Sequence, residues 1–161
     1  MSTLTVWKFD TPQGAQEALN KLIDLSKQQL IDVNDAAIVS WETGKKKPKT
    51  QNYGSLTGQG ALSGAFWGML FGLLFFVPFF GMAVGAAMGA LSGKFSDYGI
   101  NDKFIKEVRE QVTEGTSALF LMTSGAVQDR VAEAFKGVST QLVESNLSSE
   151  QAAKLAEDFG G

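Results

Sequence analysis

Two glycine-rich stretches have the composition of nucleotide-binding loops. In "GALSGKFS" (residues 89–96), Met88 stands where the phosphate-loop pattern requires glycine, and Phe95 stands where it requires serine or threonine. In "GQGALSG" (residues 58–64), Ser63 takes the third glycine position of the dinucleotide-binding pattern, and no predicted strand leads into the stretch. Neither stretch therefore predicts a nucleotide site.

Acidic side chains recur along one later segment, where paired carboxylates would be able to perform acid–base catalysis or hold a cation. They are Asp97, Asp102, Glu107, Glu110 and Glu114. Lys103, Lys106 and Arg109 alternate with them, which is typical of a solvated helix face. The chain also has no cysteine and no histidine, which excludes thiolate nucleophiles and nearly all zinc, copper and haem sites. We predict no enzyme activity, no cofactor, no metal site and no small-molecule substrate.

Formal charge divides the 161-residue chain into three blocks. Residues 1–49 carry seven lysines and six acids, and residues 94–161 carry seven basic and eleven acidic residues. Between them, residues 50–93 carry no charged side chain over 44 positions. No block is basic enough to predict nucleic-acid binding. The neutral block is instead just long enough for two short membrane helices, which need about 17 residues each at the least.

Glycine recurs at every fourth position of the neutral block, in two registers. The positions are Gly60, Gly64, Gly68 and Gly72, and then Gly81, Gly85, Gly89 and Gly93. Residues four apart lie on one side of a helix, so each register forms a smooth groove that lets a second backbone approach. In lipid, close contact between small-residue faces is a main source of helix association. The block therefore predicts two glycine-zipper helices.

Pro78 separates these two helices, because proline is tolerated in a first helical turn but breaks a helix interior. We expect helices over about residues 57–74 and 78–95, joined as a hairpin that returns the chain to its starting side. Each would be about 27 Å long, against a hydrocarbon core of about 30 Å, so the hairpin is either barely transmembrane or re-entrant. Its predicted tip consists of Phe75, Phe76, Val77, Pro78, Phe79 and Phe80.

Lysines flank the hairpin on both sides and are expected to contact lipid headgroups. They are Lys45, Lys46, Lys47, Lys49 and Lys94. Under the positive-inside tendency, these lysines indicate that the soluble part of the protein faces the cytoplasm.

The second predicted helix has small residues on more than one side. Besides its glycines it carries Ala83, Ala86, Ala87 and Ala90. The first helix instead has a bulky side suited to lipid, formed by Leu62, Phe66, Leu70 and Leu73. Since one partner helix cannot cover two faces, we expect the second helix to contact another copy and the protein to form a homo-oligomer.

The first charged block shows the pattern of a βαβ unit. A β-rich run predicts a strand over residues 3–9. Thr11 as N-cap and Pro12 at the first helical position predict a helix that ends near Leu30. A second strand is expected over residues 35–42.

The second charged block predicts another such unit. An amphipathic helix ending near Gly115 leads to a strand over residues 117–124, a helix over 127–136 and a strand over 138–145. A capping box at residues 148–151 predicts a short C-terminal helix.

Two βαβ units predict an α+β protein, namely a ferredoxin-like split βαβ sandwich with a four-stranded antiparallel sheet and two helices on one face. The hairpin is inserted between the units. The predicted organisation is a first half over residues 1–49, the hairpin over 50–96, a helix with the second half over 97–146 and the C-terminal helix over 147–161.

The stretches "GALSGAFWG" and "GALSGKFSDYGI", with "GTSALFLM" and the tail "LSSEQAAKL", resemble the bacterial predicted-membrane-protein family catalogued as domain of unknown function twelve-sixty-nine. The resemblance covers nearly the whole chain. It implies a protein of the bacterial inner membrane, and it supplies no activity, ligand or catalytic residue.

We therefore expect a non-enzymatic membrane protein that self-assembles through its glycine-zipper helices and scaffolds or shapes the membrane. One alternative is an oligomeric pore. Another is a membrane-anchored module in which the sheet binds a ligand or a protein partner. A further alternative is that the hairpins pack inside a soluble protein shell.

Overall fold

A computed structural model describes residues 2–28, 35–45, 48–54, 67, 70–71, 100, 102–135 and 140–147. The two glycine registers, the small alanines, the hairpin tip and the predicted C-terminal helix lie outside these residues.

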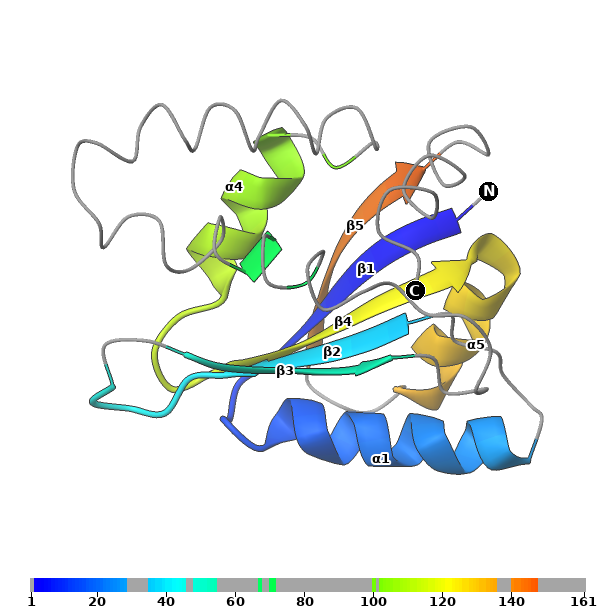
Figure 1. Ribbon diagram of the computed structural model, residues 1–161, viewed down its shortest axis with the longest axis horizontal. Coiled ribbons are helices and arrows are strands. Elements are labelled where there is room, and N and C mark those ends of the chain that lie inside the picture. Colours follow the sequence, from blue (N-terminus) through cyan, green and yellow to red (C-terminus); the bar gives the residue numbers. More distant parts are fainter. Residues whose placement is uncertain are drawn as a thin grey trace.

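The described part of the chain is built on an antiparallel sheet (Figure 1). Its strands are β1 (Ser2–Phe9), β2 (Asp35–Ser40), β3 (Lys49–Gly54), β4 (Ser117–Ser124) and β5 (Thr140–Leu147), in the order β3-β2-β4-β1-β5. Every neighbouring pair is antiparallel. The strand β4 lies between β1 and β2, and β1 lies between β4 and β5, so each βαβ unit is split by a strand of the other. The predicted four-stranded antiparallel sheet is confirmed.

The fifth strand, β3, was not predicted. It pairs with β2 at the edge of the sheet and occupies the first residues of the segment that we had assigned to the membrane hairpin. Its sequence, KTQNYG, lacks the apolar alternation that marks a half-buried strand, and β3 pairs with a neighbour on one side only. Pairing with β2 therefore determines its conformation more than local sequence does.

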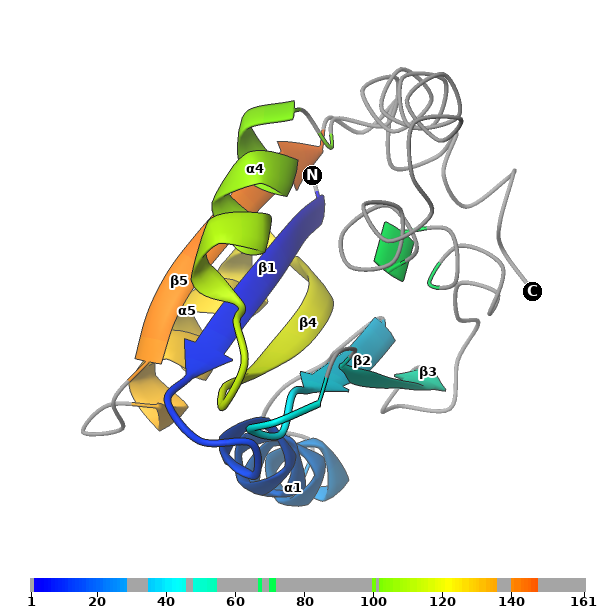
Figure 2. The same cartoon turned by 90° about the vertical axis from the view of Figure 1, so that its left-hand side faces the viewer.

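Helices cover both faces of the sheet (Figures 1 and 2). On one face lie α1 (Gly14–Lys27) and α5 (Gly125–Ala134), both within a few residues of their predicted positions. On the other face lies α4 (Asp102–Gln111). α4 ends at Gln111, four residues before the predicted end at Gly115. Gly115 instead lies in the turn before β4, with a φ of 84° in the left-handed region that glycine adopts without strain.

The strands alternate between two buried clusters, one on each face. Trp7, Phe9, Leu119 and Leu121 face α1 and α5, where Trp7 and Phe9 both make edge-on contacts with Phe135, with ring centroids 5.1 and 5.9 Å apart. The opposite side chains of the same strands face α4. These are Leu4, Val6, Ala37, Val39, Ala118, Phe120 and Met122. The sheet is thus the middle layer of the molecule.

The start of α1 corrects one prediction. Thr11 and Pro12 precede the helix, its N-cap is Gln13, and no side chain of the N-cap residue bonds the helix. Instead Ser117 on β4 accepts a hydrogen bond from the backbone N–H of Ala15, at 2.9 Å, and its hydroxyl donates to the carbonyl oxygen of Thr11, at 2.7 Å. A side chain 102 residues away in sequence thus satisfies this helix start, and no local pattern reveals it.

Candidate functional site

Two of the acidic residues considered for catalysis are exposed at the surface. On α4, Glu110 is exposed, and Glu114 beyond the helix is also exposed, with its carboxylate accepting a hydrogen bond from the backbone N–H of Gly44. Among the described residues, no three acidic side chains are grouped so that they could hold a metal ion. Asp97 lies outside these residues.

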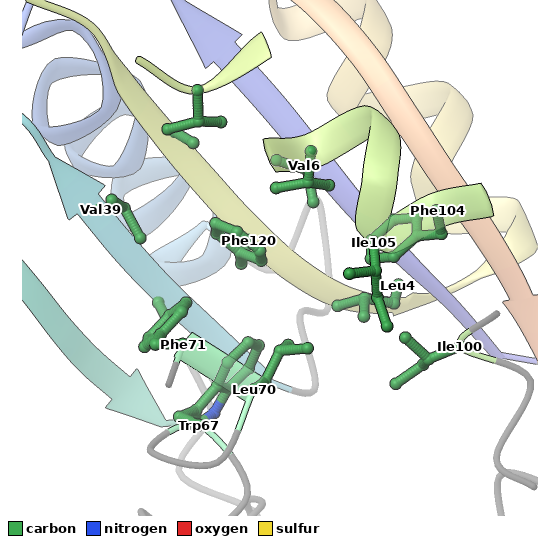
Figure 3. Packing of buried hydrophobic residues seen from close by; sticks show 14 of the residues in the cluster. Leu4, Val6, Val39, Trp67, Leu70, Phe71, Ile100, Phe104, Ile105 and Phe120 are labelled. Atoms are coloured by element: carbon green, nitrogen blue, oxygen red, sulfur yellow. The ribbon is translucent and has the colours of Figure 1, made fainter. Parts of the chain in front are cut away.

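The α4 face of the sheet receives part of the uncharged block. Trp67, Leu70 and Phe71, which have helical backbone, are at most 3% exposed and belong to the same cluster as the strand side chains (Figure 3). We call these three residues the docking triad. These residues belong to a segment that we had assigned entirely to the membrane. They connect that segment to the core of the sheet.

Aromatic contacts fix the docking triad on β4. The rings of Trp67 and Phe71 are stacked, with centroids 5.6 Å apart and planes inclined by 26°. Both rings also make edge-on contacts with the ring of Phe120 on β4. The centroid of the Phe120 ring is 6.3 Å from that of Trp67 and 5.1 Å from that of Phe71. Such offset and edge-on pairs contribute about 0.5–1.5 kcal/mol beyond the burial of their area.

Leu70 corrects a sequence prediction. We had assigned it to the lipid-facing side of the first hairpin helix, whereas its side chain is fully buried in the core on the α4 face. A leucine is equally apolar in lipid and in a protein core, so its type alone does not distinguish the two environments.

Ile100 belongs to the same buried cluster as Phe71. The 28 residues between them, 72–99, therefore leave from one core and return to it. From Ile100 the chain continues into α4, whose Phe104, Ile105 and Val108 complete the cluster. The candidate functional site is thus the α4 face, where the residues on both sides of segment 72–99 are buried.

A family model described as "Protein of unknown function (DUF1269)" matches residues 61–160. This chain belongs to the DUF1269 family. The matched range begins after β3 and contains the docking triad, Ile100, α4 and β4, so it includes the helical side of the α4 face. No curated protein and no solved structure matches the chain.

In the part of the DUF1269 chain that the structure describes, no helix combines the length and the apolar character needed to cross a membrane.

The lysines predicted to contact lipid headgroups are only partly described. Lys45 and Lys49 are exposed at the turn between β2 and β3. The remaining three of the five lie outside the described residues. Gly54, from which the chain continues toward the glycine-rich segment, lies at the opposite end of β3, about 17 Å from Lys49 at about 3.3 Å per residue.

Proposed function

We propose that this protein is a non-enzymatic, membrane-associated protein that inserts its glycine-rich hairpin into one side of a bilayer, self-assembles there and shapes or scaffolds the membrane. Its sheet takes the ferredoxin-like arrangement, which the order of β2, β4, β1 and β5 supports, with β3 added at the edge. The soluble part faces the cytoplasm at the inner membrane.

The observation that carries the proposal is the burial of Phe71 and Ile100 in one core. A segment of 28 residues that returns to its origin has about 14 residues for each direction, which as a helix reach about 21 Å. Part of this length is needed to pass the headgroup region. The hydrocarbon core is about 30 Å thick, and unpaired backbone in an extended chain is costly within it. The reach therefore favours a re-entrant wedge over a spanning hairpin.

A re-entrant wedge suits membrane shaping better than it suits a pore. A segment that ends near the middle of the bilayer cannot line a continuous water path. It does add volume to one leaflet more than to the other, and this asymmetry favours curvature.

The docking triad also leaves the glycines available for assembly. On a regular helix, Trp67, Leu70 and Phe71 share one side, and Gly68 and Gly72 lie on another. The side bound to the sheet and the side suited to close helix contact are therefore separate. Glycine in a helix interior costs about 1 kcal/mol relative to alanine, so a packing partner is needed to offset the second register, which lies wholly within residues 72–99.

Assembly is tested with the double variant Gly85→Leu and Gly89→Leu. Bulky side chains in the second register should prevent close helix contact, so we expect smaller oligomers by size measurement in detergent and smooth membranes by electron microscopy, where the parent chain gives ordered or curved ones. The matched control is the double variant Val84→Leu and Met88→Leu, in which leucines with the same spacing stand one position before each glycine. We expect this control to form the same oligomers and the same membranes as the parent chain. Unchanged oligomers in the glycine variant would contradict the proposal.

A further inference from the structure

A pocket of about 410 Å³ lies between the start of α1 and the edge strand β3, on the face of the sheet away from the docking triad. Its volume is within the range of about 300–1,000 Å³ that is usual for small-molecule sites. Its polar lining consists of Gln13, Gln16, Ser40, Glu42, Lys49, Thr50 and Gln51. Ile38, which is 5% exposed, provides an apolar surface among them.

The pairing of β2 with β3 explains why these side chains converge. Ile38 pairs with Gln51 and Ser40 pairs with Lys49, and paired residues project from the same face of a sheet. Ser40 contacts the segment before α1, so this is the face that α1 covers. β3 extends the sheet beyond β2 on the side where α1 begins (Figure 1). Residues of β3 and of the start of α1 line opposite sides of the pocket, which is open to solvent.

Two hydrogen bonds hold the walls of the pocket together. The Ser40 hydroxyl donates to the carbonyl oxygen of Pro12 at 2.7 Å, which ties β2 to the start of α1. The Tyr53 hydroxyl donates to Oε1 of Gln16 at 2.8 Å, which ties β3 to the same helix. These bonds position the two walls relative to each other, whereas the exposed side chains of Glu42 and Lys49 are ordered when a ligand binds.

The pocket is lined by one positive and one negative side chain, and neither is engaged in another interaction in the part of the chain that the structure describes. Within the described residues, the carboxylate of Glu42 and the ammonium of Lys49 form no ion pair or side-chain hydrogen bond. Neither takes part in a hydrophobic core. The amide groups of Gln13 and Gln51 add both donors and acceptors between α1 and β3.

We propose that this pocket binds a small zwitterion of the free amino acid class. In this arrangement Lys49 binds the ligand carboxylate, Glu42 binds the ligand ammonium, and the glutamine amides bind polar atoms of its side chain, with Ile38 against its apolar part. Binding here does not depend on membrane insertion, because the pocket is on the other face of the sheet from the docking triad. The molecule is bound as a ligand and is not converted.

The test is calorimetric titration of the detergent-solubilised full chain with each of the twenty free L-amino acids. We expect saturable binding of one or a few of them at one site per chain. Replacement by the N-acetyl or the C-amide form of the same amino acid should weaken binding about tenfold, since each form lacks one charge-assisted contact. No saturable binding at millimolar concentration, or equal binding of all three forms, would overturn the proposal.

Two variants assign these contacts. Lys49→Gln should weaken binding of the free amino acid about tenfold and leave binding of the C-amide form unchanged. Glu42→Gln should also weaken binding of the free amino acid about tenfold, and it should leave binding of the N-acetyl form unchanged. Both side chains are exposed, and circular dichroism checks that each variant is folded. The matched control is Lys45→Gln at the neighbouring turn, which should bind as the parent does. Binding that is indifferent to Lys49 and Glu42 would place the ligand elsewhere and overturn the assignment.

Discussion

At the level of single residues, the side chain of Ser117 connects β4 to the first turn of α1. Its hydroxyl is buried, accepts a bond from the N–H of Ala15 and donates to the carbonyl of Thr11. A helix start leaves backbone N–H groups without partners inside the helix, and a buried N–H without a partner costs about 1–3 kcal/mol. Ser117 therefore has the role that the sequence had suggested for Thr11.

Ser117→Ala should lower the free energy of unfolding by about 1–3 kcal/mol, because the buried N–H of Ala15 loses its partner, whereas the carbonyl oxygen of Thr11 still accepts from the N–H of Gly14. Thr11→Ala should change it by no more than about 0.5 kcal/mol, since Thr11 is exposed and is not the N-cap. Urea unfolding in detergent, followed by circular dichroism, compares the two variants. A larger loss for Thr11→Ala would contradict the assignment.

Gly14, the first residue of α1, lies very close to Phe9. A Cβ at this position would be 2.5 Å from the Cβ of Phe9, closer than real Cβ atoms approach. Alanine is a better helix former than glycine by about 1 kcal/mol, so helix propensity alone predicts that Gly14→Ala stabilises the protein.

We expect Gly14→Ala to lower the free energy of unfolding instead, by about 1–3 kcal/mol, because crowding at the β-carbon of a core residue outweighs the gain in propensity. The same urea experiment measures this, with Glu17→Ala in the exposed first turn as the control, expected within about 0.5 kcal/mol of the parent. A stabilised Gly14→Ala would show that β1 moves away from α1 at little cost.

At the level of elements, the docking triad and β3 are the two features that the sequence did not predict. The strands and helices that were predicted have strong periodic patterns, and Ser117–Ser124 agrees residue for residue. Trp67, Leu70 and Phe71 have an apolar character that suits lipid and sheet equally, so burial in one environment cannot be distinguished from burial in the other by residue type. Only the contacts with Phe120 identify the sheet as their environment.

Phe71→Ala should lower the free energy of unfolding of the sheet by about 3–5 kcal/mol, as expected for a phenylalanine removed from a packed core. Phe79→Ala, at the predicted hairpin tip, should leave this free energy unchanged and is the matched control. Circular dichroism during urea unfolding in detergent gives both values. Equal and small effects of the two variants would mean that residue 71 belongs to the membrane segment and not to the core.

At the level of the whole molecule, the sheet is a middle layer with a different role on each face. The face covered by α1 and α5 carries the polar pocket at its edge. The face covered by α4 holds Phe71 and Ile100, the residues on both sides of segment 72–99. The sequence predicted the sheet, its helices and an inserted uncharged segment. It did not predict how many residues of the uncharged segment belong to the core of the sheet, because the same apolar residues suit a protein core and a lipid environment.

Membrane depth tests the re-entrant wedge most directly, using single-tryptophan variants in vesicles of brominated lipid. In one variant, Trp7→Phe and Trp41→Phe leave Trp67 alone. A second variant also carries Trp67→Phe, and Val84→Trp places the tip probe near the midpoint of residues 72–99, the deepest point that the reach argument allows. We expect the fluorescence of Trp67 to be unaffected by bromine at any depth, and the tip probe to be quenched most by bromine near the bilayer centre. Quenching of Trp67, or a tip probe that bromine does not quench, would contradict a hairpin that is docked on the sheet and inserted partway into the bilayer.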